Sequence, residues 1–255
     1  MARWVWREEP LEHLALTGWP GITAWMTGRR GGVSLPPFAT LNLSYTVRDL
    51  PPAVDYNRRR AVSLGAGRRP LWARLEHGAR VCAVDRSTVR PPVADGLVTN
   101  DPTVLLAVTA ADCLPIFLAA PDIGWIGVVH AGWRGTVRRV AAAGVAALAA
   151  RGADPGRMLA ALGPGIGPCC YRVGDDVVQA VRRCPEGEDS LAWRDGQAHL
   201  DLWAMNRAQL VAGGMSPDRM ETAALCTACH TERFFSHRRE RRTGRMGGFL
   251  CLATP

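Results

Sequence analysis

The chain has 255 residues, 47% of them hydrophobic, so it can bury a sizeable core, and we expect a single domain over residues 1–255. All 31 basic residues are arginine, which excludes Schiff-base catalysis by lysine and a P-loop lysine. The formal net charge is +8, but the arginines are spread along the chain without a zinc-finger, helix-turn-helix or RNA-recognition signature, so nucleic acid is not an expected partner.

The N-terminal segment, residues 1–9, lacks the apolar stretch and small-residue cleavage site of a secretory signal. We therefore expect a cytoplasmic protein whose eight cysteines are free thiols, one or two of them ligands, rather than a disulfide framework. The first predicted elements are a strand over 21–26, a glycine-rich turn over 28–32 and a short helix over 58–64.

Three apolar runs in the middle of the chain have the length of strands and are bounded by Asp, Pro or Gly: 104–109, 114–119 and 124–130. We predict buried sheet strands there. Charged residues and prolines interrupt the whole stretch 103–129, so it does not predict a membrane span, and no membrane partner is expected.

An alanine-rich stretch predicts a helix over 137–151, which Gly152 caps and Pro155 prevents from continuing. The later predicted elements are a strand over 158–162, a turn over 163–168, helices over 175–183 and 200–213, and a strand over 247–252. Strands and helices in this irregular order favour an α+β fold over a regular βαβ winding.

Cys113 and His130 lie at the ends of neighbouring predicted strands, so both can reach one edge of a sheet. With His77 they make two imidazoles and one thiolate, which are three of the four ligands of a zinc ion; catalytic zinc sites leave the fourth position open. His77 lies in a polar segment and joins the set through the family resemblance given below. Zn²⁺ is the expected cofactor, with copper less favoured.

Other interpretations of the cysteines stay open. Cys113 can be an ordinary buried thiol, or, with His130, the nucleophile and base of a metal-free amide hydrolase. Four further cysteines suggest a metal-binding or redox-sensing module without enzymatic activity: Cys169, Cys170, Cys226 and Cys229. A structural zinc site built from Cys226, Cys229 and His230 would need a fourth ligand, for which His237 is a candidate.

Two arginine-rich segments have the ingredients of an anion site. Residues 29–34 combine guanidinium groups, glycines that let backbone amides approach a ligand, and a hydroxyl group. Residues 235–239 add a second set. Together the segments predict an anionic co-substrate.

Several blocks in one order make the chain resemble the YfiH or YlmD family, whose members combine purine nucleoside phosphorylase activity with older labels as polyphenol oxidase or laccase-domain proteins. The matching blocks are Arg29-x-Gly31-Gly32-Val33-Ser34, Leu41-Asn42-Leu43, Asn57-Arg58, Asp95-Gly96-Leu97-Val98-Thr99, Ala111-Asp112-Cys113-Leu114-Pro115, His130-Ala131-Gly132-Trp133-Arg134-Gly135, Gly163-Pro164-Gly165-Ile166, Cys226-Thr227, Phe235-Ser236-His237-Arg238-Arg239 and Thr243-Gly244-Arg245. One departure is Arg172, where the family usually has glutamate.

The resemblance implies a mixed α/β sandwich, similar to that of the cytotoxic necrotizing factor, with zinc held by His77, Cys113 and His130. It also implies phosphorolysis of adenosine, inosine and methylthioadenosine, and hydrolytic deamination of adenosine. The residues expected to bind substrate or phosphate are Arg29, Ser34, Asn42, Arg58 and Arg238; the expected catalytic residues are Asp112, Glu76 and Arg134.

A copper-dependent polyphenol oxidase is the least favoured alternative, because the chain has only six histidines and no His-x-His pair. The expected partners are purine nucleosides and inorganic phosphate. The sequence leaves the oligomeric state open.

Overall fold

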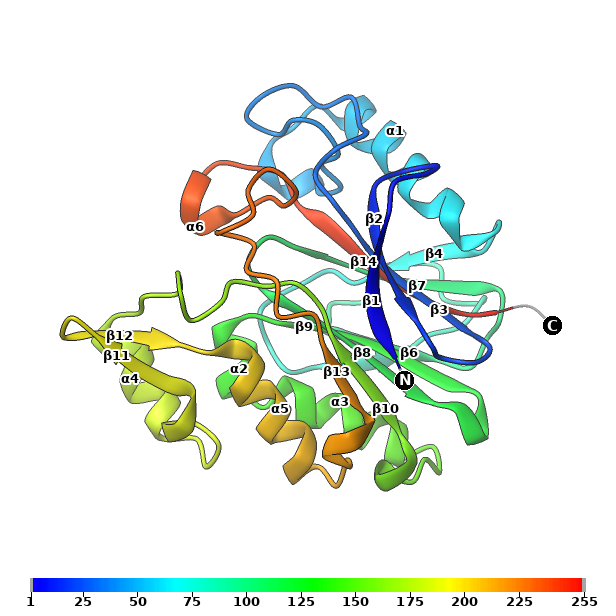
Figure 1. Cartoon of the computed structure of the whole chain (residues 1–255). Coiled ribbons are helices and arrows are strands. Elements are labelled where there is room, and N and C mark those ends of the chain that lie inside the picture. Colours follow the sequence, from blue (N-terminus) through cyan, green and yellow to red (C-terminus); the bar gives the residue numbers. More distant parts are fainter. Residues whose placement is uncertain (1, 254–255) are drawn as a thin grey trace.

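The computed structural model describes residues 2–253, whose strands form two six-stranded sheets and a small two-stranded one (Figure 1). In spatial order, the first sheet consists of β1 (Arg3–Arg7), β2 (His13–Thr17), β3 (Ile22–Thr27), β14 (Met246–Leu252), β7 (Val104–Ala110) and β4 (Arg69–Trp72). The second consists of β13 (Met220–Thr222), β10 (Leu159–Leu162), β8 (Leu114–Ala120), β9 (Trp125–Ala131), β6 (Gly96–Thr99) and β5 (Val81–Ala83). The small sheet pairs β11 (Leu191–Arg194) with β12 (Gln197–Leu200).

The two large sheets pack face to face. Along their strands, successive side chains point alternately into the space between the sheets and toward the outer faces. Leu106 of β7 and Phe117 of β8 share one buried cluster between the sheets, although they belong to different sheets. Their neighbours point outward, so Leu105 lies in the cluster under α1 and Leu118 in the cluster under the other helices. Because these strands are buried on both faces, their sequences are continuous apolar runs rather than alternating ones.

Helices cover the outer faces of the sandwich (Figure 1). The outer face of the second sheet packs against α3 and α5, and that of the first sheet against α1. The helices are α1 (Pro51–Val62), α2 (Trp133–Val137), α3 (Val140–Ala149), α4 (Asp175–Arg182), α5 (Leu202–Ala212) and α6 (His237–Glu240). Within the described residues, no helix has both the length and the apolar character needed to cross a bilayer.

The α+β prediction is confirmed, as are the central strands, but two predicted helices need correction. The helix predicted over 58–64 begins at Pro51, because two prolines occupy its first turn, where no backbone N–H is needed. The helix predicted over 137–151 begins only at Val140, as α3, because Arg139 adopts a left-handed conformation with φ of 62° that separates it from the preceding α2. Its alanine content indicated helix but not this break.

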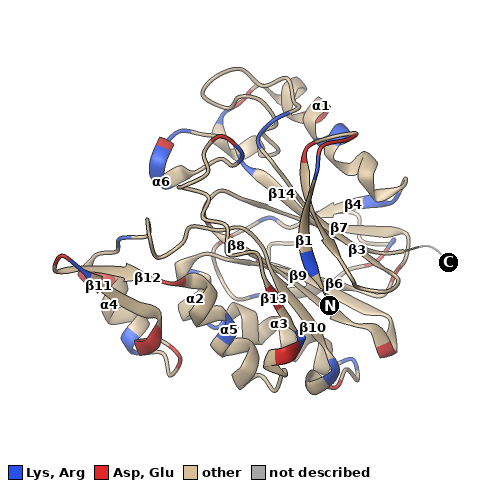
Figure 2. Cartoon of the chain, viewed as in Figure 1, with Lys and Arg blue, Asp and Glu red and all other residues tan. Residues whose placement is uncertain are grey.

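Basic residues are dispersed in space as they are in the sequence. Figure 2 shows them on α6, β4 and α5, elements that lie apart in the fold.

Candidate functional site

Strand pairing brings His77, Cys113 and His130 together. Cys113 lies in the short turn between β7 and β8, and the register of β8 with β9 sets Leu114 opposite Ala131, next to His130. The potential ligand atoms of the three residues all lie within 4.8 Å of one another. The two imidazole rings are 5.0 Å apart between centroids and nearly perpendicular, at 84°. Residues as far apart in sequence as His77 and His130 therefore meet at one edge of the sandwich, as a shared ligand set requires.

Asp95 organises this cluster and was missed as a site residue, although its block was part of the resemblance. It is fully buried just before β6, and Nδ1–H of His130 donates to its Oδ1 over 2.9 Å. The backbone N–H groups of His77 and Gly78 donate to the same carboxylate at 3.0 and 2.6 Å. With Nδ1 engaged, His130 presents Nε2 to a ligand, which is the usual arrangement of a metal-binding histidine.

The backbone around the cluster is constrained as well. His77 and Asp112 have positive φ angles of 58° and 81°, which non-glycine residues adopt at a cost and which cluster at functional sites. A Cβ at Gly132 would lie 2.9 Å from Sγ of Cys113 and 3.2 Å from Cδ2 of His77. The glycine therefore allows the thiol and the first imidazole to sit against the start of α2.

Charge at the cluster favours a thiolate. Burial disfavours ionisation of Cys113, yet the neighbouring imidazoles of His130 and His77 lower its pKa to about 6. Burial likewise opposes the charge of His130, but Cys113 and Asp95 raise its pKa to about 9. Burial also raises the pKa of Asp95, while hydrogen bonds from His130 and Gly78 lower it more, so the carboxylate stays ionised. The apoprotein therefore holds a thiolate–imidazolium pair at neutral pH.

This pair predicts a pH dependence of thiol chemistry. In chelator-treated protein, alkylation of Cys113 by iodoacetamide should reach half of its maximal rate near pH 6, because its pKa lies there, whereas an ordinary thiol reaches it near pH 8.5. Mass spectrometry of the peptide carrying Cys113, with a Cys113→Ala variant to identify background labelling, measures it. A midpoint above pH 8 contradicts the assigned interaction.

The cluster forms one end of a pocket of about 610 Å³. This volume falls in the range of small-molecule sites. The lining residues are Ser44, Tyr45, Thr46, Arg58, Trp72, Ala73, Arg74, Leu75, His77, Pro91, Thr109, Ala110, Ala111, Cys113, His130, His237 and Arg245.

Three arginines line the pocket, and two of them, Arg58 and Arg245, are partly buried, whereas Arg74 is exposed. Arg58 lies over the rings of Trp72 and Tyr45, 3.9 and 4.4 Å from their centroids, and its Nε donates to the carbonyl of Leu43. Burial lowers its pKa to about 10, which keeps it cationic at neutral pH. Arg245 donates through one amino group to the carbonyls of Thr243 and Gly244, both at 2.9 Å. Arg58 was expected at an anion site; Arg245 was missed, although it closes a block of the resemblance.

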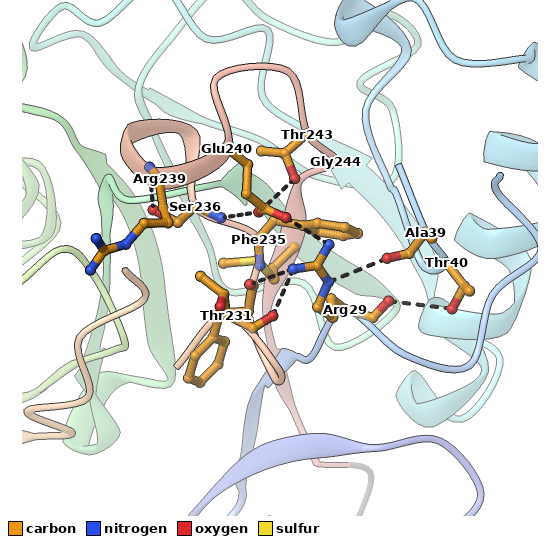
Figure 3. A network of polar contacts seen from close by, with 12 residues as sticks. Arg29, Ala39, Thr40, Thr231, Phe235, Ser236, Arg239, Glu240, Thr243 and Gly244 are labelled. Atoms are coloured by element: carbon orange, nitrogen blue, oxygen red, sulfur yellow. Dashed lines mark hydrogen bonds and ion pairs between the residues drawn. The ribbon is translucent and has the colours of Figure 1, made fainter. Parts of the chain in front are cut away.

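Arg29 does not line this pocket, contrary to the expectation that it binds phosphate. Figure 3 shows its guanidinium enclosed by protein partners. It donates to the carbonyls of Thr231 at 2.6 Å and Ala39 at 3.3 Å, pairs with Glu240 at 3.0 Å, and lies over the ring of Phe235. The side chain thus connects the segment after β3 to the segment that carries α6. Its N–H donors are bonded to protein acceptors in this structural role.

Arg29→Met should therefore lower the free energy of unfolding by about 3–5 kcal/mol, because it leaves Oε1 of Glu240 and three backbone carbonyls without their donor. The KM for phosphate should stay the same at temperatures where the variant is folded. Denaturant unfolding and steady-state kinetics measure the two effects, with the exposed neighbour variant Arg30→Met as the control. A higher KM for phosphate without loss of stability would restore the binding role.

Two more expected phosphate ligands are buried scaffold residues. Oγ of Ser34 donates to Asp49 at 2.6 Å, and the amide of Asn42 donates to the same carboxylate at 2.8 Å. The Asn42 oxygen also accepts from the backbone N–H of Arg245 at 3.0 Å. Neither side chain lines the pocket. Their hydrogen bonds to Asp49, and that of Asn42 to the backbone of Arg245, instead hold the loop that supports Arg245.

Arg238 and Asp112 do not line the pocket. Arg238 lines a neighbouring pocket, stacks over Tyr171 and donates to the carbonyl of Arg172. The carboxylate of Asp112 accepts from the hydroxyl of Thr227 at 2.7 Å and from the backbone N–H of Arg238 at 2.6 Å. Both of its oxygens are thus engaged, which suits a positioning residue better than the expected proton carrier.

The remaining catalytic candidates, Glu76 and Arg134, are exposed and absent from the pocket lining. Glu76 contributes its backbone N–H to Asp95 at 3.3 Å. The guanidinium of Arg134 lies over the ring of Trp133 on α2. The structure brings neither side chain to the metal-ligand cluster.

A second ligand cluster matches the four-cysteine set of the sequence analysis and not the alternative Cys226, Cys229, His230 and His237 combination. The sulfur atoms of four cysteines come together instead, and they are those of Cys169, Cys170, Cys226 and Cys229. His237 lines the main pocket, and His230 lies outside the cluster, near Glu232.

Residues 23–253 match the family model described as multi-copper polyphenol oxidoreductase laccase. The chain is 40% identical over 246 residues to a protein named purine nucleoside phosphorylase YlmD of Geobacillus stearothermophilus, covering 90% of each chain. It is 33% identical over 247 residues to one named purine nucleoside phosphorylase YfiH of Escherichia coli, covering 95% of this chain and all of the relative.

Solved structures show the same architecture. The crystal structure of YlmD from Geobacillus stearothermophilus superposes with a TM-score of 0.91 at 37% identity, covering 99% of this chain and all of that one. A YfiH crystal structure from Bacillus licheniformis also gives 0.91, at 32% identity, with 97% of this chain and 98% of that one covered. The expectation of a YfiH-like sandwich is confirmed.

Proposed function

The chain belongs to the YfiH and YlmD family of laccase-domain proteins, and on this premise we propose that it is a metal-dependent purine nucleoside phosphorylase. One observation carries the proposal: the His77–Cys113–His130 cluster opens into a pocket whose wall holds Arg58 and Arg245. A metal-ligand set and a cationic surface thus face the same cavity. Its size suits a nucleoside beside a phosphate ion.

Zinc is the proposed metal. The donor set of two imidazoles and one thiolate fits it, and Asp95 holds His130 with Nε2 available. Three protein ligands leave one coordination position open, as in catalytic rather than structural zinc sites. When bound, zinc would supply Lewis acidity next to the substrate.

The protein's own residues perform binding and orientation. Arg58 and Arg245 would hold phosphate by charge-assisted hydrogen bonds. An oxygen of the phosphate then forms a bond to C1′ of the ribose as the bond from C1′ to the purine nitrogen breaks, and the purine leaves with the bonding electrons. His237 lines the pocket and would give a proton to the departing base. Fixing the two reactants in one cavity removes much of the entropic cost of their encounter.

The proposed nucleosides are adenosine, inosine and methylthioadenosine, with hydrolytic deamination of adenosine as a side activity. Product chromatography from adenosine, with and without phosphate, together with zinc analysis, tests the whole set. Phosphorolysis predicts adenine and ribose 1-phosphate only when phosphate is present. Deamination predicts inosine without it. Absence of ribose 1-phosphate from zinc-loaded protein would end the phosphorylase proposal.

A second candidate is a metal-free amide hydrolase, because the hydrogen bond between Asp95 and His130 also fits a catalytic triad. Cys113, His130 and Asp95 follow one another as nucleophile, base and orienting carboxylate do in a catalytic triad. Stringent chelation separates the two functions, because a hydrolase keeps its activity without metal. Substrate that protects Cys113 from alkylation equally well with and without zinc would favour the hydrolase.

A copper oxidase receives less support. In the described part of the chain, only one of the two ligand clusters contains histidine. A multicopper centre needs several such groups, so oxidation of phenols is not part of the proposal.

A further inference from the structure

Two turns that are far apart in sequence lie side by side and are hydrogen-bonded to each other next to the second sheet. The first, over 163–171, follows β10 and carries Cys169 and Cys170; the second, over 223–230, follows β13 and carries Cys226 and Cys229. Because β10 and β13 are parallel neighbours, their ends meet at the same edge. Backbone bonds continue beyond the strands, from Gly165 N–H to Leu225 at 3.3 Å and from Thr227 N–H to Gly165 at 3.0 Å.

The four sulfur atoms have the separation of metal ligands rather than of disulfides. All lie within 4.8 Å of one another, and Sγ of Cys229 is 3.5 Å from Sγ of both Cys169 and Cys170. A disulfide needs about 2.05 Å. Four thiolates at 2.3 Å around one zinc ion stand about 3.8 Å apart along each edge of the tetrahedron. The cluster is close to that arrangement.

Neighbouring groups are placed to stabilise negative sulfur. The backbone N–H of Gly167 donates to Sγ of Cys226 at 3.2 Å. The guanidinium of Arg239 lies 3.8 Å from Sγ of Cys170 and is held there by a bond from its Nε to the carbonyl of Ala228. Two of the cysteines, Cys169 and Cys229, are exposed, so an ion can reach the site from solvent. The Gly167 N–H donor favours the thiolate of Cys226, whereas burial and the neighbouring thiols raise the pKa values of Cys169 and Cys170, whose protons a bound metal must displace.

We propose that Cys169, Cys170, Cys226 and Cys229 bind a second zinc ion, independent of the one at His77, Cys113 and His130. Four soft protein ligands fill a tetrahedral shell and select zinc over harder cations. No position is left for water or substrate, so the ion is structural. Binding displaces the thiol protons to solvent, and affinity therefore falls as pH decreases.

The ion would hold the two turns together, and the first of these turns contacts a residue beside the catalytic pocket. The turn that carries Cys170 continues into Tyr171 and Arg172, which contact Arg238 by stacking and by a hydrogen bond. Arg238 adjoins His237, which lines the catalytic pocket. Loss of the ion would release the two turns from each other, and the consequence should be lower thermal stability and a less defined position of His237.

Metal content of full-length variants tests the site separately from the proposed function. In Cys113→Ala, which lacks a ligand of the first site, one equivalent of zinc should remain. It should disappear in Cys113→Ala/Cys229→Ala, whose added change removes an exposed side chain. The matched control is Cys113→Ala/Cys82→Ser, which alters a cysteine outside both clusters and should keep the ion. The zinc content of these variants tests the second site whether or not the protein cleaves nucleosides.

Cobalt substitution supplies a readout of the ligands. Co²⁺ loaded into Cys113→Ala should give the intense thiolate charge-transfer bands of a tetrahedral four-sulfur site, and zinc should displace it. Zinc should also slow alkylation of Cys169 and Cys229 by at least tenfold. The proposal is overturned if Cys113→Ala binds no zinc, if Cys229→Ala leaves the content unchanged, or if the four cysteines form disulfides in freshly purified protein.

Discussion

Cys113→Ser is expected to remove the catalytic metal and to lower the phosphorolysis of inosine by more than about 100-fold. Loss of a residue that only holds a metal ligand in place reduces metal affinity or activity by about 10- to 100-fold, and loss of the ligand itself should have a larger effect. A serine hydroxyl stays protonated at neutral pH, so it cannot replace the thiolate that His130 and His77 favour here. Metal content after gel filtration and steady-state kinetics measure the effect.

Cys82→Ser is the matched control, because Cys82 is a partly exposed cysteine on β5 outside both clusters. It should keep wild-type activity and metal. A Cys113→Ser protein that retains zinc at the His77–His130 site and wild-type phosphorolysis would refute the assigned site. Activity that a stringently chelated wild type keeps in full would instead favour the Cys–His–Asp hydrolase.

Asp95→Asn should weaken zinc binding by about 10- to 100-fold while leaving all three ligands in place. The carboxylate accepts from Nδ1 of His130 and from the backbone N–H groups of His77 and Gly78. An amide offers one oxygen and turns an N–H₂ group toward the remaining donors, so His130 loses its fixed orientation. Isothermal titration of the apoprotein with zinc measures the affinity.

Excess zinc should restore much of the activity of Asp95→Asn, since the substitution acts through the ligand His130 and not on substrate. Asp101→Asn is the control: Asp101 is also buried and accepts from Arg86 and Thr103, but it lies outside the cluster. It should lower stability without altering zinc affinity. Equal loss of zinc affinity in both variants would show that the effect of Asp95→Asn is general destabilisation.

The fold was predictable where local signals are strong. The runs that became β7, β8 and β9 are apolar on both faces because they lie between a helical layer and a second sheet, and such runs are easily recognised. Short strands were missed: β5 and β13 are partly exposed and lack a periodic pattern. The break at Arg139 was missed because the alanine-rich sequence that follows it favours helix and carries no signal of a left-handed residue at its start.

The candidate site was predictable only in part. Residue chemistry and family resemblance identified the three possible metal ligands, and the structure brings their ligand atoms together. That a residue is an arginine in a matching block did not show whether its guanidinium binds substrate or stabilises the fold. Arg29 and Arg58 both belong to blocks that match the family. The guanidinium of Arg29 is bonded to Glu240 and to backbone carbonyls, whereas Arg58 lines the pocket.

By itself, the sequence determined the class of the protein: the α+β composition, the central strands and their turn-bounded ends, and a soft donor set suited to zinc. These follow from side-chain periodicity, turn residues and ligand chemistry, which are local properties. Only the tertiary structure decided that Asp95 orients His130, that Arg245 rather than Arg29 faces the cavity, and that four cysteines from two turns converge. Such choices depend on contacts across long sequence separations, 211 positions between Arg29 and Glu240, which no local pattern encodes.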